Sequence, residues 1–390
     1  MMEEEKDEYE LEDVEEKSSD DIIKLKMFKF MGFIVIGVII LLLILFIASK
    51  FSVQKKYTYS DVESIMKNAA ISYFKDFPES LPSEEGNIVE IDSSNLIAEG
   101  KMKDFSQYIS DGDTCKGSVL VEKMNSEYLY TPYLSCGDNY ITVELYKKVV
   151  SDNSVVTSGY GLYSVGGGYV FRGETVNNYV KLGNSLWRIV KITSNNNLVL
   201  ISSDGLPYSK PWDNRYNEVR RYEAGINQYS ASRMREYLDK VYTNPSDKDR
   251  EGIFTETVKA RIVPYNICVG KRLLSSESKD NSEECSEVLR NQKYGLLTLS
   301  DYLYASVDPN CKSSMTKSCK NYNYLTMKED WWLVTANKED NSTVFSVSRT
   351  GNVTAETAAH YAIVRPVIYL NSNVLYKSGK GTLEKPFKVR

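Results

Sequence analysis

The sequence predicts an α+β fold in three parts: one membrane-spanning helix, a small α+β module beside the membrane, and a larger β-rich distal domain. Three observations carry this prediction. A wholly apolar run occupies residues 30–48, all six cysteines follow it, and all four tryptophans lie among short strand patterns beyond residue 158. The expected segments are an acidic, disordered tail at 1–29, the span at 30–48, the proximal module at 49–146, a linker at 147–158 and the distal domain at 159–390.

The run from Phe30 to Ala48 has no charged side chain, and Lys29 and Lys50 mark its ends. A helix rises about 1.5 Å per residue, so the run fits a hydrocarbon layer of roughly 30 Å. A cleaved signal peptide has a basic leader and a shorter apolar run, and a buried core helix has a polar face. This segment follows an acidic leader and is apolar on all sides. We therefore expect an uncleaved single-pass anchor.

The six cysteines set the expected orientation, because the lysines on the two sides of the span balance. They form three consecutive pairs along the chain: Cys115 and Cys136, Cys268 and Cys285, and Cys311 and Cys319. An even number of cysteines in the C-terminal part is typical of an oxidising compartment. Sequential pairing is one of fifteen possible pairings, and reduced, buried cysteines are the alternative. We expect a cell-membrane protein with a cytoplasmic N-terminus and extracellular C-terminal domains.

Negative charge is concentrated in the tail. Residues 1–29 hold twelve Asp or Glu and five Lys, whereas the formal net charge of the whole chain is -5. A segment with so many charges and so few apolar residues cannot bury enough surface to fold alone. It is either a docking site for a basic cytosolic partner or a solvated leader. The nearly neutral remainder gives no reason to expect nucleic-acid binding.

The proximal module begins with an amphipathic helix, expected over 57–77. Ser60 and Glu63 match a capping box, in which each side chain bonds the backbone N–H of the other residue. A second short helix is expected over 94–99, where Gly100 ends it.

A β-hairpin is expected next. Strands at 117–124 and 128–134 turn at residues 125 and 126. Cys115 and Cys136 flank the two strands and are placed to join their open end.

The apolar helix followed by a small α+β head superficially resembles a type IV pilin. The pilin family has Gly followed by Phe at its peptidase site, with Glu at the fifth mature position. Here Gly32 and Phe33 are followed at that position by Gly37, and the leader is acidic. A structural pilin-like subunit is therefore kept as an alternative by analogy alone.

The distal region has mostly strand patterns and one clear helix. The helix is expected over 230–242, where apolar residues recur on one face. Strands are expected at 186–192, 198–201, 331–335, 344–348 and 362–370, with a turn at 195–197 between the first two.

A set of short motifs gives the distal region a family resemblance. The motifs are Phe171-Arg172-Gly173, Asn177-Asn178-Tyr179-Val180, Trp187-Arg188-Ile189-Val190-Lys191-Ile192, Trp331-Trp332-Leu333 and Val364-Arg365-Pro366-Val367. Together they resemble a domain family of unknown function in surface proteins of Gram-positive gut bacteria, similar to the C-type-lectin-like Fibrobacter paralogous domains. That family has W-L-R-S-P before its closing strand, and Val334 stands here in place of the Arg. The resemblance implies an extracellular recognition domain without an established ligand.

No motif for catalysis, a cofactor or a metal is present in the sequence. His360 is the only histidine and has no nucleophile nearby in sequence, which favours a structural role. Asp204, Asp213 and Glu174 would have to meet in space to form the carboxylate pair of a glycosidase. Arg365 is expected to pair with a buried acid rather than with a ligand.

Aromatic residues provide the binding candidates. An exposed phenol or indole ring suits sugars and protein anchors, and the chain has 29 tyrosines. Trp212, in a loop that also holds Tyr208 and Arg215, is the best candidate for an exposed platform. Strand alternation sends the adjacent side chains of residues 331 and 332 to opposite faces, and Trp332 is the candidate for the surface. For any single tryptophan, burial in the core is the leading interpretation and exposure the alternative.

These observations predict a single-pass surface protein that presents a binding or adhesion domain for an extracellular glycan or protein. The alternatives are an anchored hydrolase that acts on polysaccharide and the structural pilin-like subunit. The motif search favours binding over catalysis.

Overall fold

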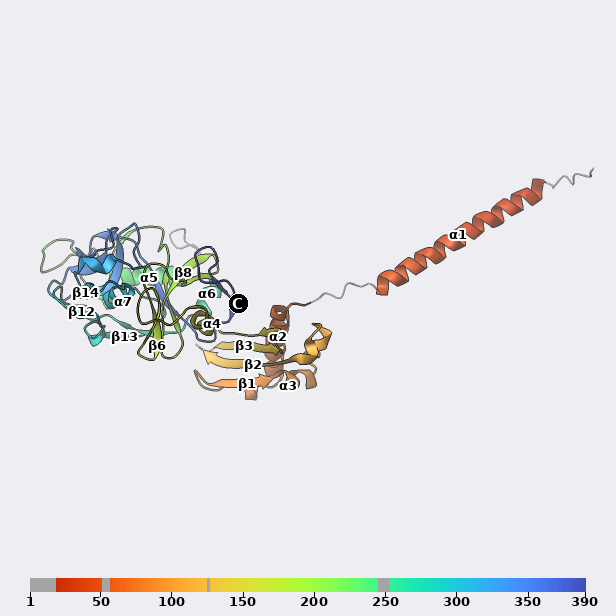
Figure 1. Ribbon diagram of the computed structural model, residues 1–390, viewed down its shortest axis with the longest axis horizontal. Helices are drawn as coiled ribbons and strands as arrows, with labels where there is room; N and C mark the ends of the chain where they lie inside the picture. Colours follow the sequence, from red (N-terminus) through yellow and green to blue (C-terminus); the bar gives the residue numbers. More distant parts are fainter. Residues whose placement is uncertain (1–18, 51–56, 125–126, 245–252) are drawn as a thin grey trace, which may run out of the picture. The chain divides into compact units, whose positions relative to one another are not determined.

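The structure is a computed structural model that describes the backbone of residues 19–50, 57–124, 127–244 and 253–390 (Figure 1). It describes the side chains of the same residues, except for those of 19–25, 43–50 and 257. The chain divides into two compact units, residues 1–62 with 104–113 and residues 63–103 with 114–390. The second unit contains the strands.

Helix α1, Ser19–Lys50, covers the predicted span. It begins before the apolar run, so residues 19–29 of the predicted tail are helical, while residues 1–18 lie outside the described residues. Across the described residues, no helix combines the length and the apolarity that a membrane span requires. The predicted span continues past Leu42, the last residue of α1 whose side chain is described, so its end lies outside the described side chains.

Short helices and strands follow. They are α2 (Tyr59–Asp76), η1 (Pro78–Ser80), β1 (Ile88–Asp92), α3 (Ser93–Ala98), η2 (Phe105–Gln107), η3 (Gly112–Thr114), β2 (Cys115–Met124), β3 (Glu127–Cys136), β4 (Tyr140–Ile141) and α4 (Leu145–Asp152). The strands form an antiparallel sheet in the order β1-β2-β3-β4. Helix α3 confirms the second predicted helix.

The predicted hairpin is confirmed by strands β2 and β3. They pair along their whole length, from Cys115 opposite Cys136 to Met124 opposite Glu127. A disulfide joins the two cysteines at the open end. The predicted turn residues, 125 and 126, lie outside the described residues.

The capping box of α2 lies two residues earlier than predicted. The Asp61 carboxylate accepts a hydrogen bond from the Thr58 N–H at 2.8 Å, and Thr58 Oγ1 accepts one from the Asp61 N–H at 3.2 Å. The prediction of Ser60 and Glu63 was wrong because the helix starts at residue 59 rather than later. Glu63 is instead buried, and its carboxylate accepts a hydrogen bond from the Tyr140 hydroxyl at 2.9 Å.

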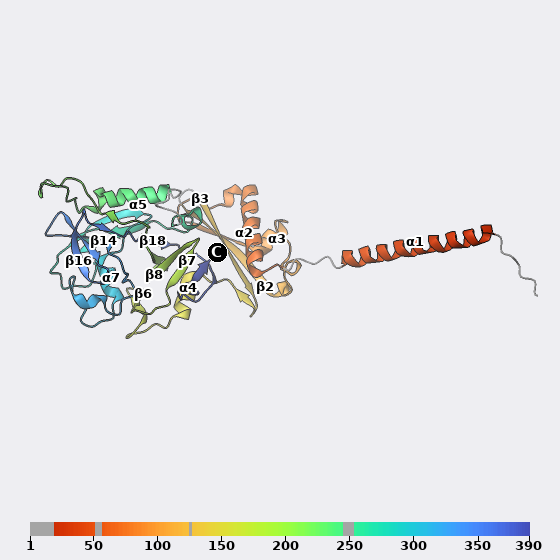
Figure 2. The same cartoon turned by 90° about the horizontal axis from the view of Figure 1, so that it is seen from above.

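Beyond α4 the second unit is β-rich, which confirms the predicted α+β class with a β-rich distal part (Figure 2). Its strands are β5 (Gly161–Val165), β6 (Gly168–Arg172), β7 (Tyr179–Leu182), β8 (Ser185–Ile192), β9 (Leu198–Ser202), β10 (Lys210–Pro211), β11 (Tyr265–Cys268), β12 (Lys271–Arg272), β13 (Val288–Gln292), β14 (Trp331–Asn337), β15 (Thr343–Val347), β16 (Val353–Thr357), β17 (Tyr361–Ala362), β18 (Val367–Leu370), β19 (Tyr376–Ser378) and β20 (Phe387–Val389). Its helices are η4 (Tyr229–Ala231), α5 (Arg233–Thr243), α6 (Glu256–Lys259), η5 (Glu284–Ser286), α7 (Leu299–Ala305) and η6 (Lys317–Lys320).

The largest sheet has eight strands. Six follow the order β18-β9-β8-β7-β20-β19, and β6 pairs with both β8 and β5. A second sheet has the order β12-β14-β15-β16, and β10-β17 and β11-β13 form two short ladders. Neighbouring strands are antiparallel except in the pairs β20 with β7 and β12 with β14. Strands β7 and β8 of the first sheet carry Tyr179 and Arg188 of the candidate site.

Most local predictions in this region are confirmed. Strands β8, β9, β14 and β15 lie where the patterns predicted them, and disulfides join Cys268 to Cys285 and Cys311 to Cys319. Helix α5 starts at residue 233 because the Ser232 side chain caps it, accepting from the N–H of Arg235 at 3.1 Å. The prediction of one continuous strand over 362–370 was wrong.

The strand predicted at 362–370 is split into β17 and β18. Pro366 has no N–H to give to a sheet ladder. Between the two strands the Ile363 N–H donates to Asp330 and the Val364 carbonyl accepts from Leu206, so this segment leaves the sheet. The interruption turns Arg365 away from a regular strand position.

The segment predicted as a linker, 147–158, begins inside helix α4. Leu145 and Val149 of this helix are fully buried. The Leu145 N–H donates to the Val374 carbonyl at 2.7 Å, and the Tyr376 N–H donates to the Val143 carbonyl at 2.9 Å. Backbone hydrogen bonds therefore connect this helix to the C-terminal strands.

A buried ion pair joins the second sheet to the helices that pack on it. Arg272 Nη1 and Glu284 Oε2 are 2.9 Å apart, and both side chains are fully buried. The Glu284 carboxylate also accepts from the N–H and the hydroxyl of Ser300 and from the hydroxyl of Thr335. Burial raises the pKa of Glu284. These bonds compensate the cost of removing the two charges from water.

We expect Glu284→Gln to lower the free energy of unfolding by about 3–5 kcal/mol, because it leaves the buried Arg272 charge without its partner. Urea denaturation followed by circular dichroism measures the loss. The matched control is Glu256→Gln, which removes an exposed partner of Lys259 and should change stability by less than about 1 kcal/mol. Equal effects of the two substitutions would contradict the assignment.

Candidate anion-binding site

A pocket of about 340 Å³ lies where strands β7 and β8 meet the turn after β9 and the loop that leads into β14. We call it the arginine pocket, because two of the side chains that line it are buried arginines. Its lining residues are Tyr179, Arg188, Ser203, Asp204, Tyr324, Thr326, Met327, Lys328, Glu329 and Arg365.

Arg188 reaches the pocket from the middle of β8. It pairs with Tyr179 on β7, and its side chain is only 8% exposed. Its Nε donates to Asn178 Oδ1 and its Nη1 to the Tyr324 carbonyl, both at 2.9 Å. The guanidinium carbon lies 4.2 Å from the ring centre of Tyr179 and 4.6 Å from that of Tyr324. These contacts hold the charge in place by hydrogen bonds and cation–π attraction.

Arg365 reaches the same pocket from the segment before β18 and is 2% exposed. Its Nε donates to the Ser202 carbonyl at 3.0 Å and its Nη1 to the Leu325 carbonyl at 2.9 Å. Its guanidinium carbon lies 4.6 Å from the ring centre of Trp331. The predicted buried acid partner was wrong: the carbonyls supply the acceptors, and Arg365 has no ion pair with a described residue. The exposed Asp204 acts on it only through space.

The buried side chain of Asn323 shapes the turn that carries the Tyr324 and Leu325 carbonyls, which accept from the two arginines. Its Nδ2 donates to the carbonyls of Tyr302 at 2.9 Å and Cys319 at 3.0 Å. Its Oδ1 accepts from the Leu325 N–H at 3.0 Å. The consecutive carbonyls of Tyr324 and Leu325 are thereby held toward the two guanidinium groups.

The pocket therefore holds two positive charges without a paired carboxylate. Burial lowers the pKa of Arg188, and burial together with the charge of Arg188 lowers the pKa of Arg365 to about 10. In the part of the chain that the structure describes, neither Nη2 atom donates a hydrogen bond. Because a buried charge is unfavourable without compensation, an anion bound by the free donors would stabilise this arrangement.

Part of the pocket falls in a segment that matches a known family. Residues 195–372 match the model of a domain of unknown function, DUF6273. The expected resemblance to a domain family of unknown function is thereby confirmed. Arg365 and Tyr324 lie inside the DUF6273 segment, whereas Arg188 and Tyr179 precede it. Comparisons with curated proteins and with solved structures give no match.

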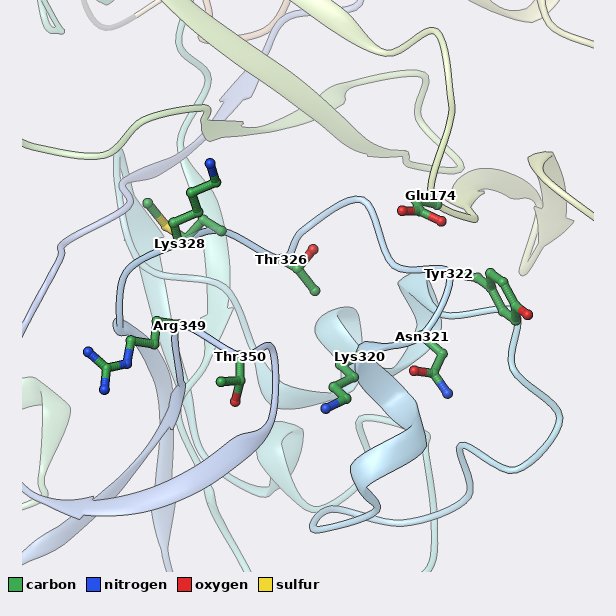
Figure 3. Close-up of a pocket in the computed structure, with 9 residues that line it drawn as sticks. Glu174, Lys320, Asn321, Tyr322, Thr326, Lys328, Arg349 and Thr350 are labelled. Carbon is green, nitrogen blue, oxygen red and sulfur yellow. The ribbon is translucent and has the colours of Figure 1, made fainter.

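A second pocket, of about 730 Å³, lies beside the first and is built mainly from the DUF6273 segment (Figure 3). We call it the lysine pocket. Its lining residues are Glu174, Lys320, Asn321, Tyr322, Thr326, Met327, Lys328, Arg349 and Thr350. Thr326, Met327 and Lys328 line both pockets.

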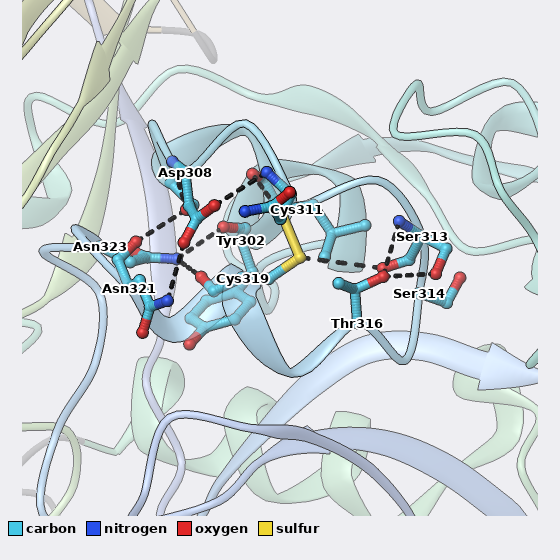
Figure 4. The surroundings of a disulfide bond; sticks show 12 residues. Tyr302, Asp308, Cys311, Ser313, Ser314, Thr316, Cys319, Asn321 and Asn323 are labelled. Carbon is cyan, nitrogen blue, oxygen red and sulfur yellow. Dashed lines mark hydrogen bonds between the residues drawn. A yellow bond between two sulfur atoms is a disulfide. The ribbon is translucent and has the colours of Figure 1, made fainter.

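The loop beneath the lysine pocket is held by the Cys311–Cys319 disulfide (Figure 4). Asn321 follows it, and its Nδ2 donates to Asp308 Oδ2 at 2.7 Å. The Ser306 hydroxyl donates to the Asn321 carbonyl at 2.8 Å. The backbone that carries Lys320 and Tyr322 is therefore ordered by covalent and hydrogen bonds within the DUF6273 segment.

The two predicted tryptophan sites are corrected by the structure, because both side chains are fully buried. Trp212 packs against Tyr229 with ring centres 5.8 Å apart, and its indole N–H donates to the Leu333 carbonyl at 3.3 Å. The indole N–H of Trp332 donates to the Lys210 carbonyl at 2.9 Å. Every residue of β14 is buried, so alternation exposes neither of its tryptophans. Trp212 is thus no exposed platform, and Trp332 lines no surface.

Arg215 and Tyr208, the other two candidates, lie outside both pockets. The Arg215 guanidinium pairs with the buried Asp213 carboxylate at 2.5 Å and donates to the Ala231 carbonyl. This pairing holds the loop before α5, which is a structural role. Tyr208 is 53% exposed, with the Lys210 ammonium 5.8 Å from its ring centre.

The three carboxylates considered for catalysis are dispersed. Asp213 is committed to Arg215, whereas Asp204 and Glu174 line different pockets. His360 lies 3.8 Å from Asp330. Among the described residues, no group of three or more His, Cys, Asp or Glu is placed to hold a metal ion.

Arg188 was not among the residues predicted for a site, and Arg365 was predicted to pair with a buried acid. One signal was present: Arg188 lies in the strand Trp187-Arg188-Ile189-Val190, where its neighbours are all apolar. A charged residue at a buried strand position needs compensation, which points to a network or a site. The identity of the partners was not visible, because they lie far away along the chain.

We expect Trp212→Ala to lower the free energy of unfolding by about 3–5 kcal/mol, because it empties a large buried volume and removes a hydrogen bond. Urea denaturation monitored by circular dichroism tests this. Tyr208→Ala, at an exposed position nearby, serves as the control and should change stability by about 0.5 kcal/mol or less. An unchanged midpoint for Trp212→Ala would contradict the buried position.

Proposed function

We propose that this chain is a membrane-anchored surface protein whose distal domain recognises an anionic extracellular ligand in the arginine pocket. One observation carries the binding proposal: the buried guanidinium groups of Arg188 and Arg365 line one pocket and have no ion pair with a described residue. Planar guanidinium donors match a carboxylate, sulfate or phosphate group.

Recognition explains this arrangement better than catalysis does. The carboxylates that line the arginine pocket, Asp204 and Glu329, are exposed, whereas a general acid usually needs burial to keep its proton near neutral pH. The lining includes no histidine, cysteine or lysine other than the exposed Lys328. A C-type-lectin-like recognition domain, as the sequence motifs imply, agrees with a binding role.

The proposed location rests on two sequence features and one structural feature. The apolar run at 30–48 supports an anchor, and the position of all six cysteines beyond it supports a cytoplasmic N-terminus. All six cysteines form disulfides, as is typical of an extracytoplasmic compartment. The proposal therefore places residues 57–390 outside the cell.

Binding of a simple anion tests the pocket. The full-length chain in a non-ionic detergent should bind sodium glucuronate and not glucose in isothermal titration calorimetry. Arg365→Gln and Arg188→Gln should each weaken glucuronate binding at least about tenfold, because a hydrogen bond to a charged group contributes about 1.5–3 kcal/mol.

Arg172→Gln is the matched control for these variants. Arg172 also donates to two backbone carbonyls, those of Tyr304 and Ser306, but lies outside both pockets. It should leave glucuronate binding unchanged. Ser203→Trp fills the arginine pocket while both arginines are kept, and it should abolish binding while the near-ultraviolet circular dichroism stays native. Binding that survives Ser203→Trp, or equal binding of glucose, would overturn the proposal.

Topology has its own test. Trypsin added to intact cells should digest the C-terminal region, detected with an antibody to the last residues, while an epitope tag on residue 1 stays protected. Protection of the C-terminal epitope until the cells are lysed would refute the proposed orientation.

A further inference from the structure

The arginine pocket and the lysine pocket adjoin each other along a shared wall. They share Thr326, Met327 and Lys328, which belong to one loop before β14. With volumes of about 340 and 730 Å³, the two together are larger than a single carboxylate or a single sugar ring requires. The shared wall indicates a ligand that extends from one pocket into the other.

The lysine pocket provides a second place for negative charge. Lys320, Lys328 and Arg349 line it (Figure 3), and none of them has an ion pair with a described residue. They come from η6, the shared loop and the turn after β15, whereas Arg188 comes from β8 of the first sheet and Arg365 from the segment before β18. A ligand that spans both pockets therefore meets two separate groups of cations.

Aromatic rings stand beside these cations. Tyr322 lines the lysine pocket and is 49% exposed, and Tyr160 beside it is 43% exposed. Their ring centres are 5.9 Å apart. An exposed phenol presents a flat apolar face with a polar tip, which suits the C–H face and the hydroxyl groups of a sugar ring.

Carboxylates at the same two pockets select against a densely charged polymer. Glu174 lines the lysine pocket, and Asp204 and Glu329 line the arginine pocket. Carboxylates accept hydrogen bonds from sugar hydroxyls, but they repel closely spaced phosphates. The mixture of cations, acceptors and exposed rings fits a polymer that is rich in hydroxyl groups and carries its charges at intervals.

We infer that the ligand is an anionic polysaccharide with repeating uronic acid residues. One carboxylate binds Arg188 and Arg365 in the arginine pocket, a later one binds the cations of the lysine pocket, and a sugar ring stacks on Tyr322. This inference rests on the proposed function and deepens it by naming the class of ligand.

Chain length provides the test. The full-length chain in non-ionic detergent is titrated with galacturonic acid and with its trimer and hexamer, and with cellohexaose as the neutral polymer. The hexamer should bind at least about tenfold more tightly than the monomer, and cellohexaose should bind at least about tenfold more weakly than the hexamer. Lys320→Ala combined with Arg349→Ala should remove the gain from chain length and leave monomer affinity unchanged.

Matched controls separate this inference from the proposed function. Lys380→Ala combined with Lys388→Ala removes the same charge from outside both pockets and should preserve the preference for the hexamer. Equal affinity for monomer and hexamer would overturn the inference of a polymeric ligand, but the proposal that the arginine pocket binds an anion would stand. Failure of any uronate to bind would overturn the proposed function itself. If oligo-dT or polyphosphate bound more tightly than the hexamer, the inference of a polysaccharide ligand would be overturned.

Discussion

The side chain of Asn323 makes the interaction on which the rest of the site depends. It is almost fully buried, at 1% exposure, and uses its amide in three directions at once. Two of these bonds fasten it to α7 and to the disulfide loop, and the third shapes the turn that follows. The carbonyls of Tyr324 and Leu325, which flank this turn, accept from Arg188 and Arg365. An aspartate at this position would lack the N–H donors, so it could not bond the carbonyls of Tyr302 and Cys319.

Backbone carbonyls replace acidic side chains around both arginines, and this substitution has a clear electrostatic effect. A carboxylate partner would cancel the charge of each arginine, whereas a carbonyl satisfies the hydrogen bonds and leaves the charge in place. Aromatic rings at 4.2 to 4.6 Å add further stabilisation without neutralising it. The fold thus keeps two positive charges inside a β-rich domain at an acceptable cost in stability.

The fold could be predicted from the sequence where the determinants are local. The hairpin of β2 and β3, the strands β8 and β9 and the helix α5 follow from periodicity, turn residues and caps within short windows. Disulfides were expected, but their pairing was left open among fifteen possibilities; the structure joins consecutive cysteines, so that each bridge closes a short loop. The site could not be predicted in this way: Arg188 and the carbonyl of Tyr324 are 136 residues apart, and Arg365 and the carbonyl of Ser202 are 163 apart. The prediction for Trp332 failed for the same reason, since its indole N–H donates to the carbonyl of Lys210, 122 residues away. Local patterns show that a residue is unusual for its strand, but they do not show what it meets.

The cations of the two pockets stand on different kinds of structure. The buried arginines stand on or beside paired strands of the largest sheet. Lys320 instead ends η6, next to the Cys311–Cys319 disulfide, and Tyr322, Lys328 and Arg349 stand on loops and turns. Substitutions in those loops disturb few core contacts, so they are tolerated more readily than changes in the strands. The buried arginines can therefore stay fixed while the sequence of the adjoining loops varies. The same division gives protein engineers a scaffold in which one loop and one turn can be randomised around two fixed positive charges.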